Sequence, residues 1–142
     1  MNDIAPIQRR PDWRSCLTVH LDKVARDPFI YGTHDCALFA AGCVEAMTGV
    51  DLACRYRGTY STLKGGLKLL AVDGFDSHVA LVRAHFSEVP PSFAQVGDIM
   101  VLHVQAGIDA LGIDLGERIA VLRQGELGMA PRDAAIAAYR VP

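Results

Sequence analysis

The pattern of apolar residues changes near Val96, and this change constrains the fold more than any other feature of the 142-residue chain. Before it, apolar side chains recur at steps of three and four, which is typical of amphipathic helices. After it, short runs such as GDIMVLHV and RIAVLR are rich in β-formers and are separated by glycines, as hairpin-linked strands are. Helices followed by a meander of strands predict an α+β fold, with N-terminal helices packed on an antiparallel sheet.

The chain length predicts one domain with a core of its own. Residues 1–12 are interpreted as an N-terminal arm and residues 13–142 as the single domain. Helices are expected over four segments, namely 13–26, 35–48 with Gly49 as the stop, 62–71 and 78–86. Strands are expected over 97–104, 110–115, 118–123 and, shorter, 127–131. The segment RDAAIAAY, residues 132–139, is interpreted as a short helix.

Charge and hydropathy exclude several classes of partner. The formal net charge is −2, with both signs mixed along the chain and no basic block, so we expect neither nucleic acid nor an anionic membrane as a partner. No uncharged apolar run approaches the roughly 18 residues that a membrane span needs. The N-terminal stretch MNDIAPIQRRPDW has no apolar core of the signal-peptide kind, so we expect synthesis in the cytoplasm without export by the usual route.

The cysteines do not form a metal-binding pattern. No CxxC pair is present, and no histidine stands at a zinc-ligand spacing beside a cysteine. Nothing in the sequence indicates an oxidising compartment, so we predict free thiols, no metal and no cofactor. The four thiols are those of Cys16, Cys36, Cys43 and Cys54.

Cys36 allows two interpretations. It follows Asp35 at the expected start of the second helix, within the stretch YGTHDCALFAAGCVEAMTG. Cys36 shares an apolar stripe with Phe39 and Cys43, and free cysteine behaves as a small hydrophobe, so spacing alone favours a core residue. Position favours a nucleophile, because the amides and dipole of a helix N-terminus stabilise a thiolate and lower the pKa below the usual ~8.5. If any cysteine here is a nucleophile, it is Cys36.

A nucleophilic cysteine also needs a base within hydrogen-bond reach, and that base must be oriented. His34 is two residues from Cys36 and is either a residue that lines the site or a turn residue. His103 falls in the first expected strand, where a half-buried structural residue is the commoner outcome and a base is the alternative. We expect structural, surface or helix-cap positions for the other three histidines, His20, His78 and His85.

Three phrases in order, YGTHDCALFAAGCVEAMTG, VGDIMVL and ALGIDLG, resemble the motifs of NlpC-type cysteine peptidases. That family has a papain-like α+β fold, and its members cut peptides or amides in bacterial cell walls. The chain is more closely similar to small NlpC-like phage and prophage proteins encoded among tail genes, which share the HDCALF, VEAMTGVD and ALGI phrases. This likeness extends over about residues 13–141.

The resemblance implies roles for particular residues. Cys36 takes the position of the nucleophile, and Tyr31 takes that of the tyrosine that lines the substrate site. His34 is also assigned to substrate binding, and this assignment rests on its position two residues before Cys36 and not on the family pattern. Gly97 and Asp98 take the positions of the pair that opens the first strand.

The resemblance also exposes a departure from the family pattern. Ala110 stands where the family keeps its catalytic histidine, and the third polar residue falls near Ala120 or Val121, neither of which can orient an imidazole. A positioned acid or base typically contributes about 10²–10⁴-fold in rate, and in a cysteine peptidase it also protonates the leaving amine. His103, on the neighbouring strand, is the candidate replacement if it reaches Cys36.

Two functions therefore compete. The missing histidine favours a structural or assembly component of a phage or prophage tail, with a degenerate peptidase site, other tail proteins as partners and incorporation into the tail particle. The alternative is an active cysteine peptidase or amidase that cleaves bacterial cell-wall peptides, with Cys36 as nucleophile and His103 as base. A more remote hypothesis is a thiol-based binding or transfer domain in which Cys36 forms a transient thioester.

Overall fold

The computed structural model describes residues 6–103, 108–123 and 125–142, and within these ranges the predicted α+β class is confirmed. The helices are α1 (Trp13–Val24), α2 (Cys36–Thr48), α3 (Leu63–Val72) and α4 (His78–His85). The strands are β1 (Glu88–Val89), β2 (Ile99–His103), β3 (Asp109–Asp114), β4 (Arg118–Leu122), β5 (Leu127–Pro131) and β6 (Ala135–Tyr139). Short 3₁₀ turns, η1 (Pro91–Phe93) and η2 (Arg132–Ala134), precede β2 and β6.

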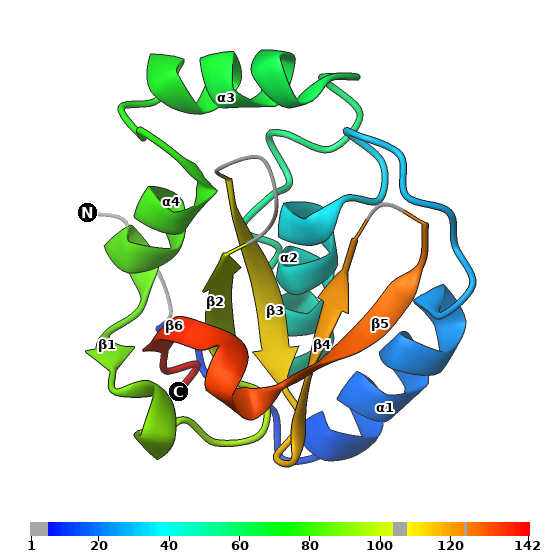
Figure 1. The fold of residues 1–142 in the computed structure, drawn as a ribbon, viewed down its shortest axis with the longest axis vertical. Coiled ribbons are helices and arrows are strands. Elements are labelled where there is room, and N and C mark those ends of the chain that lie inside the picture. The colour runs from blue at the N-terminus through cyan, green and yellow to red at the C-terminus, as the bar shows by residue number, and fades with distance from the viewer. Residues whose placement is uncertain (1–5, 104–107, 124) are drawn as a thin grey trace.

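The strands form one antiparallel sheet in the order β1-β6-β2-β3-β4-β5. The predicted meander is confirmed for β2 to β5, and β6 returns to pair on the outer side of β2. Helix α2 lies behind the sheet against β3 and β4, α1 packs on α2, and α3 lies at one end of the molecule beyond the sheet (Figure 1). None of the helices in the described residues is long and apolar enough to cross a lipid bilayer.

Apolar side chains cover both faces of the sheet. One face packs against the helices, and its cluster includes Phe39 and Cys43 of α2 together with Ile99, Leu111 and Ile113 of the sheet. A second cluster on the opposite face consists mainly of small and medium side chains, namely Ala94, Met100, Leu102, Ala110, Ile119, Val121, Ala130 and Ala138. Burial on both faces explains why the strand sequences are nearly continuous in apolar residues.

Both predicted ends of α2 are confirmed. Asp35 is in extended conformation and its carboxylate accepts the backbone N–H of Leu38, which is the N-cap arrangement. At the other end Gly49 has φ 83° and donates its N–H to the carbonyl of Glu45, as a left-handed C-terminal residue does. The local sequence therefore fixes Cys36 as the first residue of the helix.

The predicted helix over 132–139 is wrong. Residues Arg132–Ala134 form one 3₁₀ turn, and Ala135–Tyr139 is strand β6, which pairs with both β1 and β2. Tyr139 is fully buried in the helix-side cluster, and Ala138 is fully buried in the cluster on the other face. Tertiary pairing thus outweighs the helix propensity of the alanines. Strand β1 was not expected, because two residues are too few to show alternation.

Residues near both termini meet at the opening of β2. Asp98 is fully buried, and its carboxylate accepts hydrogen bonds from Arg9, Arg140 and the backbone N–H groups of Gln95 and Val141. The backbone N–H of Arg9 also donates to the carbonyl of Pro142 at 2.7 Å. The strand-opening Asp98 therefore holds the two ends of the domain together. Residues 1–5 of the predicted arm and the last residue of the predicted strand 97–104 lie outside the described residues.

Candidate functional site

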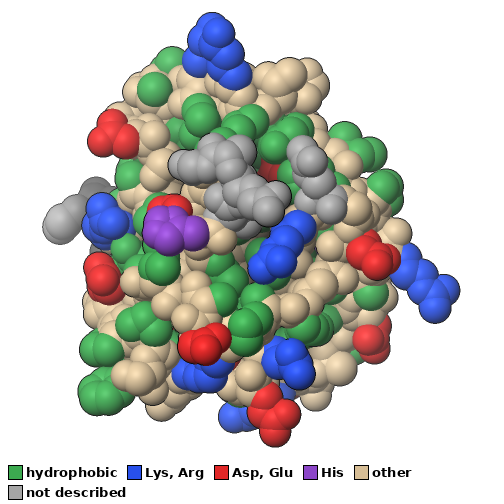
Figure 2. Space-filling model, in the orientation of Figure 1, with side chains coloured by type: hydrophobic (Ala, Val, Ile, Leu, Met, Phe, Trp, Pro, Cys, Tyr) green, Lys and Arg blue, Asp and Glu red, His purple; other side chains and the backbone are tan. Residues whose placement is uncertain are grey.

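A cleft of about 860 Å³ lies between α2, α3, α4 and the ends of the central strands. Its walls are mainly apolar, and its polar or reactive lining residues are Tyr31, Asp35, Cys36, Tyr56, Tyr60, His78, His103, Asp109 and Arg123. Over the face drawn in Figure 2, side chains of opposite charge are interspersed between groups of hydrophobic ones. A cavity of this size and apolar character is typical of a binding site for a small molecule or a peptide side chain.

Cys36 is half-buried on the cleft wall, at the first position of α2. Backbone groups of Leu111 in β3 and of the first residues of α2 lie near the thiol and act to lower its pKa. Strands β3 and β4 pair only from Gly112 onward, so the segment of β3 that faces Cys36 is not paired to β4. The start of α2 and strand β3 therefore both lie next to the sulfur. The predicted position of Cys36 in the first turn of the helix is confirmed.

Of the two interpretations of Cys36, its surroundings favour the uncharged, packed thiol. Burial raises the pKa of the thiol, and the negative charge of Asp35 acts in the same direction. The backbone groups of Leu111 and of the helix start act in the opposite direction but do not overcome burial. Cys36 is therefore a protonated thiol at neutral pH, and a protonated thiol is a poor nucleophile.

Asp35 connects the start of α2 to the loop that precedes α3. Besides Leu38, its buried carboxylate accepts the N–H of Gly32 at 3.1 Å and the hydroxyl of Tyr60. Gly32 has φ 84°, and a Cβ there would lie 1.8 Å from the carbonyl oxygen of Tyr60, so this position requires glycine. Burial and the hydrogen bond to Asp35 raise the pKa of Tyr60. Gly32 and Asp35 of the YGTHDC phrase thus have structural roles.

His78 is a site residue that sequence reasoning missed. It begins α4, is 8% exposed, lines the cleft, and its Nε2 donates to the carbonyl oxygen of Asp109 at 2.5 Å. The expectation of a surface or helix-cap role is therefore wrong for His78, although it is confirmed for the exposed His85. The sequence did contain a signal for this position, because the spacing places His78 on the same helical face as Leu81 and Val82, which also line the cleft.

His103 lies at the mouth of the cleft, opposite Asp109 in the β2–β3 pair. Its Nδ1 donates to the carboxylate of Asp109 at 2.7 Å, which leaves Nε2 as the nitrogen available to other groups. The side chain is 74% exposed, so the expected half-buried position is wrong. His103 and Cys36 line the same cleft, but no hydrogen bond among the described residues joins an imidazole to the sulfur.

His34 does not line the cleft. Its ring packs edge-on against that of Phe39, with 6.4 Å between ring centroids. Burial lowers the pKa of His34, and its Nε2 is buried without a hydrogen-bond partner in the described part of the chain. Of the two predicted substrate-binding residues, only Tyr31 borders the cleft, where its ring packs edge-on against Phe29.

The position assigned to the family's histidine is closed by apolar packing. Ala110 is 3% exposed and belongs to the second cluster, against which Cys36 also packs. Ala120 and Val121, near the position of the third polar residue, are fully buried in β4. The wall beside the thiol is therefore apolar at the positions where a peptidase of this pattern would carry its proton-transfer groups.

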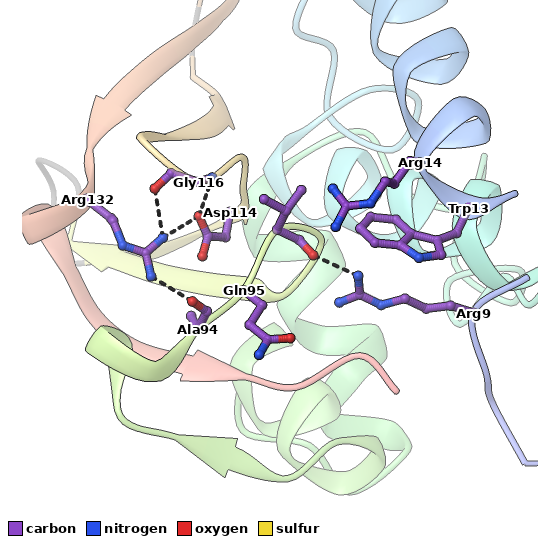
Figure 3. A pocket seen from close by; sticks show the side chains of 9 residues that line it. Arg9, Trp13, Arg14, Ala94, Gln95, Asp114, Gly116 and Arg132 are labelled. Atoms are coloured by element: carbon purple, nitrogen blue, oxygen red, sulfur yellow. Dashed lines mark hydrogen bonds and ion pairs between the residues drawn. The ribbon is translucent and has the colours of Figure 1, made fainter. Parts of the chain in front are cut away.

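A second pocket, of about 380 Å³, lies between the start of α1 and the β3–β4 turn. Arg132 and Asp114 stand on one side of it and Arg9, Trp13 and Arg14 on the other (Figure 3). Arg132 donates to the buried carboxylate of Asp114 at 2.5 Å and to three backbone carbonyls nearby, those of Gly116, Pro91 and Ala94. The guanidinium groups of Arg9 and Arg14 lie 4.2 and 4.5 Å from the centroid of the Trp13 ring. The Arg132 contacts join the start of η2 to the β3–β4 turn and to the segment after η1, and the two stacked arginines lie beside the start of α1.

Comparison with known proteins gives one informative result. No curated protein matches this chain. A family model matches residues 8–141, a range that includes the residues lining the cleft, Cys36, Asp98 and strands β1 to β6 of the described residues. The chain therefore belongs to the family described as "Domain of unknown function (DUF6950)".

Proposed function

We propose that this protein is a structural or assembly component of a phage or prophage tail, with a papain-like, NlpC-type fold and a degenerate peptidase site. The cleft holds a segment of a neighbouring tail protein and does not cut it. The link to tails rests on the resemblance of the HDCALF, VEAMTGVD and ALGI phrases to small tail-encoded proteins. The fold assignment is supported by a cysteine at the start of α2 that faces the central strand of an antiparallel sheet.

The inference that peptidase activity has been lost rests on the surroundings of Cys36. The thiol of Cys36 has a raised pKa and an apolar wall at Ala110, where the resembling peptidases carry a histidine. Amide hydrolysis by a thiol needs a thiolate to attack and an acid to protonate the leaving amine. The described residues around the sulfur supply neither group, so binding is the function that a cleft of this size supports best.

Deletion of the gene from a prophage-carrying strain, followed by electron microscopy of induced particles, tests the proposal. We expect defective tails, restored by the wild-type gene and by Cys36→Ser. The variant Ala41→Trp, which adds bulk to the α2 wall of the cleft, should fold but fail to restore the tails. Normal particles from the deletion strain, or full rescue by Ala41→Trp, would contradict the proposal.

A second function is favoured by the hydrogen-bonded pair His103–Asp109. A carboxylate that orients an imidazole at the edge of the same cleft is the arrangement of a general base with its orienting group. The alternative is thus a cysteine peptidase or amidase that acts on bacterial cell-wall peptides. Incubation with peptidoglycan fragments separates the two, because that function requires release of products by the wild type and silence in both Cys36→Ala and His103→Ala.

A further inference from the structure

Helix α3 is amphipathic, and its apolar side faces the cleft. Leu63, Gly66, Leu67 and Leu70 line the cavity at helical spacing, while Lys64 is exposed on the other side. Of the residues in α3, only Leu70 is buried. The apolar face thus borders a cavity instead of a close-packed core, and Figure 1 shows the helix at the end of the molecule, beyond the sheet.

The segments that flank α3 are suited to movement. Gly58 precedes the helix with φ 74° and Gly74 follows it with φ 89°, and a Cβ at either position would meet no atom within 4 Å. The helix packs mainly on α4 and makes few contacts with α2 or the sheet. Segments with few packing contacts open at a lower free-energy cost than the core does.

Two tyrosine hydroxyls hold α3 in place. Tyr60, just before the helix, donates to the buried carboxylate of Asp35, and its ring lies so close to Gly66 that a Cβ there would be 3.1 Å away. Tyr56 donates at 2.5 Å to the carboxylate of Asp73, the C-cap residue of α3. One bond thus ties the entry of α3 to the start of α2, and the other ties its end to the preceding loop.

We propose that α3 is a lid over the cleft, latched by the Tyr60–Asp35 and Tyr56–Asp73 hydrogen bonds, and that its opening controls access of large molecules to the Cys36 thiol. Opening breaks both of these hydrogen bonds and exposes Leu63 and Leu67 to water, so the closed state dominates. The inference concerns entry to the cleft alone. It applies equally to a cleft that binds and to one that cleaves, so its failure and that of the proposed function are distinguishable.

The test compares the rate at which Cys36 reacts with a small reagent, iodoacetamide, and with a bulky one, a fluorescein maleimide, by mass spectrometry of the peptide that contains it. Loss of a hydrogen bond to a carboxylate shifts an opening equilibrium by about tenfold or more. We expect Tyr60→Phe and Tyr56→Phe each to accelerate the maleimide reaction by about that factor, with a smaller change for iodoacetamide. Tyr139→Phe is the matched control, because its hydroxyl bonds Arg83 away from the cleft.

Hydrogen exchange gives an independent readout. The amides of residues 63–72 should exchange about tenfold faster in the two latch variants, while those of α2 keep their wild-type rates. Equal maleimide rates in the latch variants and the wild type would overturn the proposal. An acceleration in Tyr139→Phe as large as in the latch variants would overturn it too, because it would indicate global unfolding as the route to Cys36.

Discussion

Replacing Asp35 by alanine tests whether this residue has a structural role. Asp35 precedes the candidate nucleophile, where a catalytic function is easily assumed. In the structure its carboxylate accepts three hydrogen bonds, from the N–H groups of Gly32 and Leu38 and from the hydroxyl of Tyr60. The variant Asp35→Ala removes all three acceptors at once and leaves the donors in place.

The expected loss in the free energy of unfolding follows from these three hydrogen bonds. Loss of the N-cap to Leu38 costs about 1 kcal/mol. The N–H of the buried Gly32 and the half-buried hydroxyl of Tyr60 each lose their acceptor, and an unsatisfied buried donor costs about 1–3 kcal/mol. Removal of a buried charge offsets part of this sum. We therefore expect Asp35→Ala to lower the free energy of unfolding by about 3 kcal/mol or more.

Urea denaturation followed by far-ultraviolet circular dichroism measures this loss, with the denaturant slope checked for two-state behaviour. The control is Thr62→Ala, which removes the exposed N-cap of α3 and its single bond to Gly65, at a cost of about 1 kcal/mol. A loss for Asp35→Ala no larger than that for Thr62→Ala would refute the argument, since it would leave Asp35 with no role beyond capping.

Two further predictions concern the rest of the domain. Asp98→Asn removes the buried charge that pairs with Arg9 and Arg140, so the free energy of unfolding should fall by about 3 kcal/mol or more in urea titrations, and a loss under about 1 kcal/mol would contradict this. Burial lowers the pKa of His20 and of His34, so the unfolded chain takes up protons first as the pH falls. Their contribution to stability is therefore present above about pH 6.5 and is lost below it. Unfolding titrations between pH 7.5 and 5 should give a flatter profile for the double variant His20→Gln/His34→Gln than for the wild type, and identical slopes would refute the assignment.

The sequence was sufficient to predict those features of the site that depend on local chemistry. The start of one helix near Asp35, with Cys36 in its first turn, and its stop at Gly49 were predicted, because the signals for helix ends act over three or four residues. The ordered strands from Ile99 to Leu122 were predicted in the same way from alternation and glycine punctuation.

The features that could not be predicted depend on interactions between residues that are distant in the sequence. Tyr60 bonds Asp35 across 25 positions and Tyr56 bonds Asp73 across 17, so neither partner could be read from neighbouring residues. Ala135–Tyr139 is a strand because it pairs with both β1 and β2. These partners are in place only when the sheet has assembled. The sequence left the ionisation of Cys36 open between two interpretations, because helix position is a local feature, whereas burial, which raises the pKa of its thiol, depends on the whole fold.

The pH dependence of the alkylation rate of Cys36, followed by mass spectrometry of its peptide with iodoacetamide, tests the central claim most directly. Burial, together with the charge of Asp35, keeps this sulfur protonated, so the rate should rise with an apparent pKa above the ~8.5 of an ordinary cysteine. A rate that has already reached its plateau by pH 7 would reveal a stabilised thiolate and contradict the account of a cleft that binds without cutting.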